Sequence, residues 1–120
     1  MDRERLFSWV SSDFGIEPEY PWGDNNAVLR HRENRKWFAA VLEVGRDKLG
    51  LSGEGMVDVV NVKCDPLLIG SLLTQPGFHR AYHMNKEKWL SIRLDGSVEE
   101  SQVRLLVSLS YDLTSPKKKP

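Results

Sequence analysis

The residues that could do chemistry in this sequence gather in residues 78–96, FHRAYHMNKEKWLSIRLDG. The stretch contains two histidines, four lysines and arginines, one tyrosine and one tryptophan around the pair Asn85-Lys86. These residue types suit three different structures: a metal or catalytic site, a hairpin that binds nucleic acid, or a β-hairpin with only a structural role.

A metal site is disfavoured by the geometry expected for His79 and His83. The two histidines are four residues apart, which on a helix would place both imidazoles on one face. Asn85-Lys86 between two alternating runs favours strands instead, and a strand separates the two Cα atoms by about 13 Å. That distance is too long for two ligands of one zinc ion, and no cluster of cysteines or carboxylates provides other ligands. We therefore expect no bound metal and no cofactor.

Catalysis would depend on Cys64, the only cysteine in the chain. Cys64 precedes a predicted helix N-terminus, a position at which the pKa of a thiol can fall. No sequence signal ties a histidine to it, and the serines lack a nucleophile-elbow pattern. Because a lone cysteine is usually a packing residue, we expect that the protein is not an enzyme.

The elements that position these residues follow from hydrophobic periodicity and turn residues. The chain predicts, in order, a helix at 3–12, strands at 27–31, 36–44 and 56–63, a helix from Pro66, strands at 78–83 and 88–94, and a final helix. Asp2, Asp65 and the capping-box pair Ser97 and Glu100 mark the three helix starts. The residues expected to face the core are Leu6, Phe7 and Val10 in the first helix, Leu68, Leu72 and Leu73 in the second, and Val103, Leu106, Val107, Ser110 and Leu113 in the third.

This order, α-β-β-β-α-β-β-α, predicts an α+β fold in two layers, with one antiparallel sheet and helices on one face. At 120 residues, with 40% hydrophobic content, we expect one domain at residues 1–115 and a disordered basic tail at 116–120. No apolar run is long enough to span a membrane, and the start of the chain lacks an apolar signal core. Together with the single cysteine, these features favour a cytoplasmic protein without a membrane partner.

Strand pairing assigns the side chains of the predicted hairpin to two faces. If residue 82 lies opposite 89 and residue 80 opposite 91, one set of residues points toward the helices and the other points away. The residues expected to point toward the helices are Ala81, Leu90, Ile92 and Leu94. His79 and His83 are each two residues from Ala81 on the same predicted strand, so they are expected on the same face. The set on the open face, which is the side of the sheet away from the helices, is Arg80, Tyr82, Trp89, Ser91 and Arg93. In the third strand, Asn61 and Lys63 also point to the open face, whereas Val60 and Val62 suit the core.

Several blocks of the chain resemble the MmcQ/YjbR family of small bacterial domains. The blocks are VNVKCDP, PGFHRAYHMNKEKWLSIRLDG and LLVSLSYDL, and the segments YPWGD and WFAAVLEV are similar to further landmarks of the family. The resemblance runs from about residue 18 to residue 114. It implies a two-layer fold like that of secretion chaperones. It also implies DNA binding, through a likeness to a double-wing transcription-factor domain.

Charge along the chain is segregated although the totals balance at 17 basic and 17 acidic residues. Residues 30–36, residues 78–93 and the tail 116–120 each carry a net charge of +3, so the rest of the chain carries −9. A basic surface beside aromatic side chains suits nucleic acid, because cations neutralise phosphates and aromatic rings stack on bases. The DNA-binding residues expected on this reading are Lys63, Arg80, Tyr82, Lys86, Lys88, Trp89 and Arg93.

A protein-interaction module is the alternative, because Tyr82 and Trp89 would suit a peptide or a second subunit equally well. The zero net charge favours this alternative, and the clustering of bases favours DNA. Both hypotheses remain open at the level of sequence.

Overall fold

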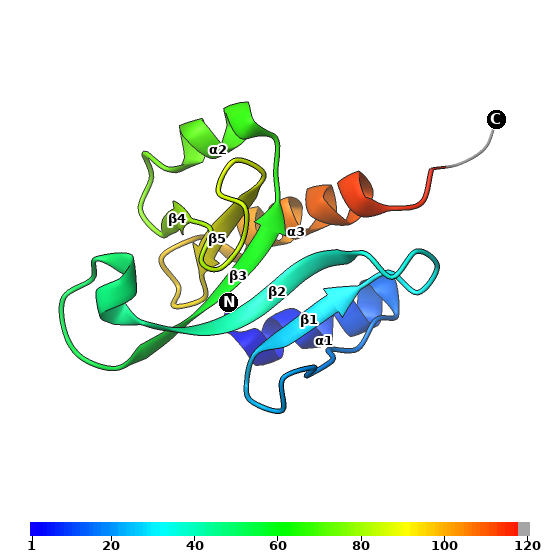
Figure 1. Cartoon of the computed structure of the whole chain (residues 1–120), viewed down its shortest axis with the longest axis horizontal. Helices are drawn as coiled ribbons and strands as arrows, with labels where there is room; N and C mark the ends of the chain where they lie inside the picture. The colour runs from blue at the N-terminus through cyan, green and yellow to red at the C-terminus, as the bar shows by residue number, and fades with distance from the viewer. Residues whose placement is uncertain (118–120) are drawn as a thin grey trace.

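Five strands form one antiparallel sheet with the spatial order β1-β2-β3-β5-β4 (Figure 1). The computed structural model describes residues 1–117. Its elements are α1 (Arg3–Phe14), β1 (Ala27–Arg30), β2 (Trp37–Gly45), the 3-10 helix η1 (Arg46–Leu49), β3 (Met56–Lys63), α2 (Pro66–Leu72), β4 (Phe78–Arg80), β5 (Trp89–Arg93) and α3 (Glu100–Thr114). Apart from the short η1, this is the predicted order, and the α+β fold class is confirmed.

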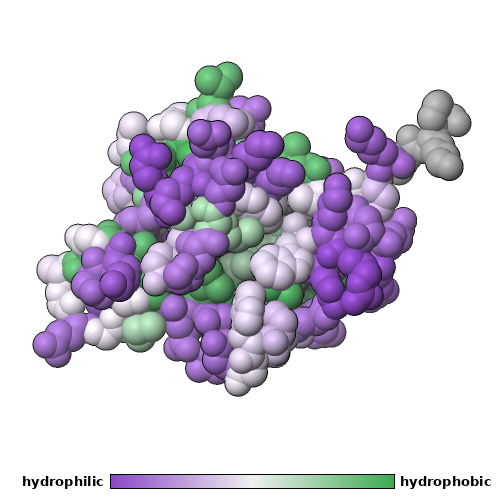
Figure 2. All heavy atoms as spheres, in the orientation of Figure 1, coloured by the Kyte–Doolittle hydropathy of each residue, from purple (hydrophilic) through white to green (hydrophobic). Residues whose placement is uncertain are grey.

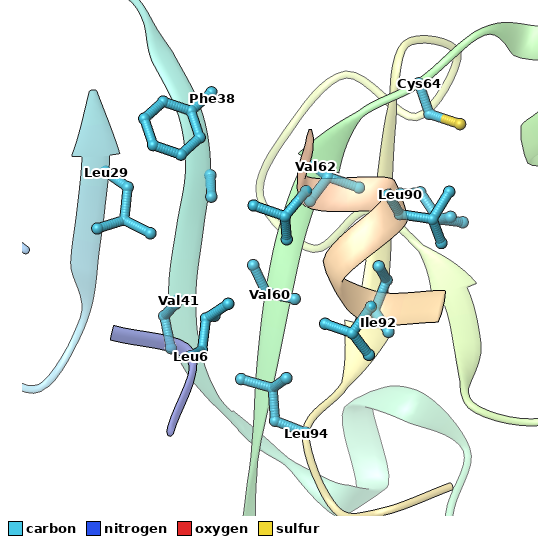
Figure 3. Packing of buried hydrophobic residues seen from close by; sticks show 14 of the residues in the cluster. Leu6, Leu29, Phe38, Val41, Val60, Val62, Cys64, Leu90, Ile92 and Leu94 are labelled. Carbon is cyan, nitrogen blue, oxygen red and sulfur yellow. The ribbon is translucent and has the colours of Figure 1, made fainter. Parts of the chain in front are cut away.

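The three α-helices pack on one face of the sheet and form the main core with it. Alternation places Val60 and Val62 of β3 and Ile92 of β5 on this face, where Leu6 of α1 joins them (Figure 3). Each of these four side chains is fully buried. Burying a side chain of this size stabilises the fold by about 1.5–3 kcal/mol, so this face dominates the stability of the chain.

The opposite, open face carries a second and smaller apolar cluster. Its buried members are Val28, Ala40, Leu42, Val44 and Val59. Four partly buried residues pack on them, namely Trp37, Leu49, Tyr82 and Met84. Leu49 belongs to η1, and Tyr82 and Met84 lie between β4 and β5, so segments outside the sheet cover part of this face.

The predicted start of α3 is wrong. The residue that caps α3 is Glu99, whose side chain makes no capping hydrogen bond. Ser97, expected at the cap, instead bonds with Asp95 through its backbone N–H at 3.1 Å and its hydroxyl at 2.5 Å. The starts of α1 and α2 are confirmed, because Asp2 accepts from the N–H of Arg5 and Asp65 accepts from that of Leu67.

The core-facing stripes are confirmed only in part. In α3 the first four predicted residues are buried, but Leu113 is 57% exposed and Thr114 is buried instead. In α2 the buried residues are Ile69 and Leu72, whereas Leu68 and Leu73 pack at the edge of the core. Residues 118–120 of the predicted tail lie outside the described residues. Within residues 1–117, no helix is both long and apolar enough to cross a membrane.

Candidate functional site

The two strands predicted for residues 78–94 do pair antiparallel, but both are shorter than predicted and their predicted register is wrong. β4 ends at Arg80 and β5 begins at Trp89, and the eight residues between them form a loop. The register pairs His79 with Ser91 and Arg80 with Leu90, one residue away from the predicted pairing. Because a shift of one residue exchanges the two faces of a strand, His79 lies on the face of Ser91, and Arg80 does not.

Residues 81–88, which we call the covering loop, are held against the open face by a buried polar pair. Asn61 of β3 and Ser91 of β5 are directly opposite each other and fully buried. The Asn61 amide donates to the backbone carbonyl of Tyr82 at 2.8 Å, and the Tyr82 N–H donates to the Ser91 hydroxyl at 3.0 Å. The Ser91 hydroxyl in turn donates to Asn61 Oδ1 at 2.5 Å. The prediction that Asn61 points to the open face is correct, but the loop removes it from solvent.

The far part of the covering loop is fixed by its own backbone. The carbonyl of Asn85 accepts from the N–H groups of Lys88 and Trp89, and its side chain accepts from the N–H of Glu87 at 2.8 Å. The Lys88 carbonyl accepts from the N–H of Cys64 at 2.9 Å. His83 adopts a left-handed backbone with φ of 62°, which is uncommon outside glycine. These hydrogen bonds define the path of the loop. Lys86 and Lys88 are both exposed on it.

The seven predicted DNA-binding residues differ in how far they are exposed. Lys63 and Trp89 are paired neighbours, both half-buried, and Tyr82 packs on the second apolar cluster. Arg93 is largely enclosed, with 14% of its side chain exposed and its Nε 3.6 Å from Asp95. Arg80 is exposed at the sheet edge, and Lys86 and Lys88 are exposed on the covering loop.

An apolar groove beside the covering loop was missed by the sequence analysis. It encloses about 420 Å³ and is lined by Trp22, Asn26, Trp37, Ala40, Leu42, His83 and Met84. Trp22 and Trp37 meet edge to face with 5.8 Å between ring centroids, and Trp22 is 52% exposed. Figure 2 shows neutral and apolar residues at the centre of this face, surrounded by hydrophilic ones. The available signal was Trp22 itself, an apolar residue in a loop of prolines and glycines.

Comparison with known proteins identifies the family. The family model YjbR matches residues 14–113. The chain belongs to the YjbR family. It is 38% identical over 116 residues to "Uncharacterized protein YyaQ" of Bacillus subtilis (strain 168), covering 95% of this chain and 98% of that protein.

Solved structures support the YjbR fold. A crystal structure of a Pseudomonas syringae protein is 35% identical, with a TM-score of 0.93 over 96% of this chain and 100% of that one. A solution NMR structure from the same organism gives 34% identity and a TM-score of 0.88, covering 100% and 98%. A Deinococcus radiodurans DUF419 domain shares the fold at 21% identity and a TM-score of 0.72, covering 97% and 80%.

In this YjbR domain, cations from separate segments lie at one end of the sheet. Asn34, in the turn between β1 and β2, donates to the carbonyl of Thr114 at the end of α3 at 2.8 Å. Lys63 ends β3 opposite the start of β5. The cations at this end are therefore Arg32, Arg35, Lys36, Lys63, Lys88 and Lys117, and the acids there are Glu33, Asp65, Glu87 and Asp112.

The opposite end of the YjbR domain is acidic. A hollow of about 660 Å³ there is lined by Asp2, Arg3, Glu4, Phe7, Tyr20, Asp24, Asn25, Glu43 and Asp58. Its one cation, Arg3, makes a two-pronged ion pair with Asp58 at 2.8 and 2.9 Å. The excess of acid at this end accounts for part of the negative charge that balances the basic stretches.

The possibility of a reactive Cys64 is not supported. Its side chain is buried, and burial raises the pKa of its thiol instead of lowering it. Within residues 1–117, no group of three or more histidines, cysteines and carboxylates is placed to hold a metal ion.

Proposed function

We propose that this YjbR-family chain is a DNA-binding module that uses the covering loop and the apolar groove beside it. The observation that carries the proposal is the position of Lys86 and Lys88, exposed on a loop that is fixed to the sheet and that also lines a groove containing the exposed Trp22. A fixed loop loses little conformational freedom on binding, which favours affinity. The family resemblance implies the same role.

Each part of this surface would contact a different part of DNA. Lys86 and Lys88 would neutralise backbone phosphates, a sequence-independent contact that releases counterions. The groove between Trp22 and His83 suits a flat unpaired base, because stacking on an aromatic ring is worth about 1–3 kcal/mol per base. Paired bases are stacked inside a duplex and cannot enter the groove, so we expect single-stranded DNA to bind more tightly than duplex.

The test is fluorescence anisotropy with labelled single-stranded and duplex oligonucleotides over a series of salt concentrations. The double substitution Lys86→Ala/Lys88→Ala should weaken binding and lower the salt slope by about 0.7 units per lost contact with a single strand. Folding should change little, since exposed substitutions usually stay within about 0.5 kcal/mol. The matched control is Arg5→Ala/Arg104→Ala, which removes two charges from helices on the other side of the sheet and should leave the slope unchanged. No binding by the wild-type chain at low salt would refute the proposal.

A protein-interaction role is the second candidate, and the apolar lining of the groove favours it. Ala40, Leu42 and Met84 offer contact to an aliphatic or aromatic side chain as readily as to a base. A peptide bound there would lose affinity on Trp22→Ala but not on Lys86→Ala/Lys88→Ala, and its binding would depend weakly on salt. That pattern, measured by calorimetry with apolar peptides, separates this role from DNA binding.

A further inference from the structure

A second hollow lies on the other side of the covering loop from the apolar groove. It encloses about 210 Å³ between η1, β4 and the loop. Tyr82 and Lys86 line this hollow, whereas His83 and Met84 line the groove, so the loop separates the two. The complete lining of the hollow is Lys48, Leu49, His79, Arg80, Ala81, Tyr82 and Lys86.

The charged residues of this lining are all cations. Lys48, Arg80 and Lys86 come from three separate segments, and none of them forms an ion pair within residues 1–117. Arg93 and its partner Asp95 lie close enough to His79 to act on its pKa in opposite directions, so together they add little net charge. An anion in the hollow would be attracted by all three cations.

His79 lines the same hollow and has one ring nitrogen without a hydrogen-bond partner in the described part of the chain. This nitrogen, Nε2, is buried. Burial and Arg93 lower the pKa of the imidazole and Asp95 raises it, and the net lowering favours the neutral ring at pH 7. A buried polar atom without a partner costs free energy. Because this atom is buried, an oxygen acceptor in the hollow would reach it only after a movement of the ring or of the covering loop.

We propose that this hollow is a binding site for a phosphate group. A phosphate presents several oxygens around one centre, and cations from three separate segments that line the hollow can each donate a charge-assisted hydrogen bond. Arg80 offers a planar fork that matches two phosphate oxygens, and the two lysines supply point charges.

The inference rests on the proposed function in one respect: if the chain binds DNA, the phosphate in the hollow belongs to the DNA backbone. A strand that crosses the covering loop would place a phosphate beside Tyr82 and the neighbouring base beside His83, in the groove. A free nucleotide has the same phosphate chemistry and is the other source.

The site itself is tested with inorganic phosphate alone, by nitrogen-15 NMR at pH 7 and constant ionic strength. Phosphate should shift the His79 ring nitrogens and the Arg80 Nε signal in a saturable way, and chloride should not. Arg80→Ala, and separately Lys48→Ala, should each weaken phosphate binding about tenfold, as expected for one charge-assisted hydrogen bond. The control Lys36→Ala removes an exposed cation at the end of the sheet and should have no effect. Shifts that do not saturate, or that survive both substitutions, would overturn the proposal.

Two further probes separate the sources and separate this proposal from DNA binding. If thymidine monophosphate binds as tightly as a short oligothymidine, the hollow is a site for free nucleotides. If the oligothymidine binds much more tightly, the hollow is a site for a phosphate of the DNA backbone. If the oligonucleotide binds through Lys86 and Lys88 while phosphate causes no saturable shift, the hollow is not a site and the proposed function stands. If phosphate saturates the hollow and no oligonucleotide binds, the site stands and DNA binding fails.

Discussion

Asn61 and Ser91 face each other across β3 and β5, fully buried, and together hold the backbone of Tyr82. Polar residues opposite each other in two central strands are costly unless every donor and acceptor has a partner. Here the amide and the hydroxyl bond to each other and to both backbone groups of Tyr82. The pair therefore fixes where the covering loop lies.

Replacing Asn61 by alanine should free the covering loop. The substitution removes the partner of the Tyr82 carbonyl and leaves the buried Ser91 hydroxyl without its acceptor, a loss of about 1–3 kcal/mol. Hydrogen exchange at residues 82–88 should accelerate more than exchange in β2. Asn34→Ala, which removes one bond to the Thr114 carbonyl and one from the Lys36 N–H, is the control and should leave exchange in the covering loop unchanged. Equal exchange in the two variants would mean that the pair does not hold the loop.

Gly77, just before β4, should not tolerate a side chain. Its φ is 89°, and an added Cβ would overlap the side chain of Val98 and lie 2.8 Å from the Ser97 hydroxyl. Backbone strain of this kind costs about 1–3 kcal/mol, and the overlap adds to it. Gly77→Ala should therefore lower the free energy of unfolding by more than about 2 kcal/mol in urea titrations.

Gly70→Ala is the matched control for that substitution. Gly70 lies inside α2, and nothing is within 4 Å of the position that its Cβ would take. Alanine in a helix is favoured over glycine by about 0.5–1 kcal/mol, so this variant should be more stable than the wild-type chain. Destabilisation by both alanines would point to a general intolerance of substitution around β4 and not to the backbone of Gly77.

Acid should weaken the fold through His31. This residue is buried, its Nε2 lies 2.9 Å from the Thr114 hydroxyl oxygen, and burial lowers the pKa of its imidazole. Because its pKa is lower in the folded chain, the unfolded chain binds more protons below the unfolded value of about 6.5. The contribution of His31 to the free energy of unfolding is therefore complete above about pH 6.5, and it is lost as the pH falls toward the pKa of His31 in the folded chain.

Thermal melts between pH 8 and pH 5 would measure this effect. His79 also has a lowered pKa, so the comparison that isolates His31 uses His79→Gln as a background. In that background the melting temperature should still decrease as the pH drops below about 6.5, and adding His31→Gln should remove most of this decrease. An unchanged slope after both substitutions would assign the acid sensitivity to carboxylates such as Asp95, whose pKa is also lowered.

Local patterns in the sequence were enough to predict most elements. β3 occupies residues 56–63 as predicted, because alternation and its flanking residues are contained within the strand. The capping roles of Asp2 and Asp65 are also local, since each side chain bonds to a backbone group two or three residues away. The predictions of family and of fold class rest on many such features and are confirmed.

What the sequence could not supply are contacts between distant residues. The path of the covering loop depends on Asn61 and Ser91, which are 30 residues apart, and the register error of β4 follows from missing that contact. Thr114 is buried in place of Leu113 because its hydroxyl pairs with His31, 83 residues earlier. The groove was missed because Trp22 and Met84 reach it from two separate loops.

Trp22 provides the sharpest test of the groove. Half of its surface is exposed and its main aromatic contact is Trp37, so Trp22→Ala should change the free energy of unfolding by less than about 1 kcal/mol. If a base stacks in the groove, the same substitution should weaken binding of single-stranded DNA by about 1–3 kcal/mol and leave the salt slope unchanged, because no phosphate contact is lost. Trp22→Phe should restore part of the affinity. Leu105→Ala, a similarly exposed apolar residue on α3, is the control and should not affect binding. Anisotropy measurements in which Trp22→Ala and Leu105→Ala behave alike would exclude the groove as the base site, whatever the lysines of the covering loop do.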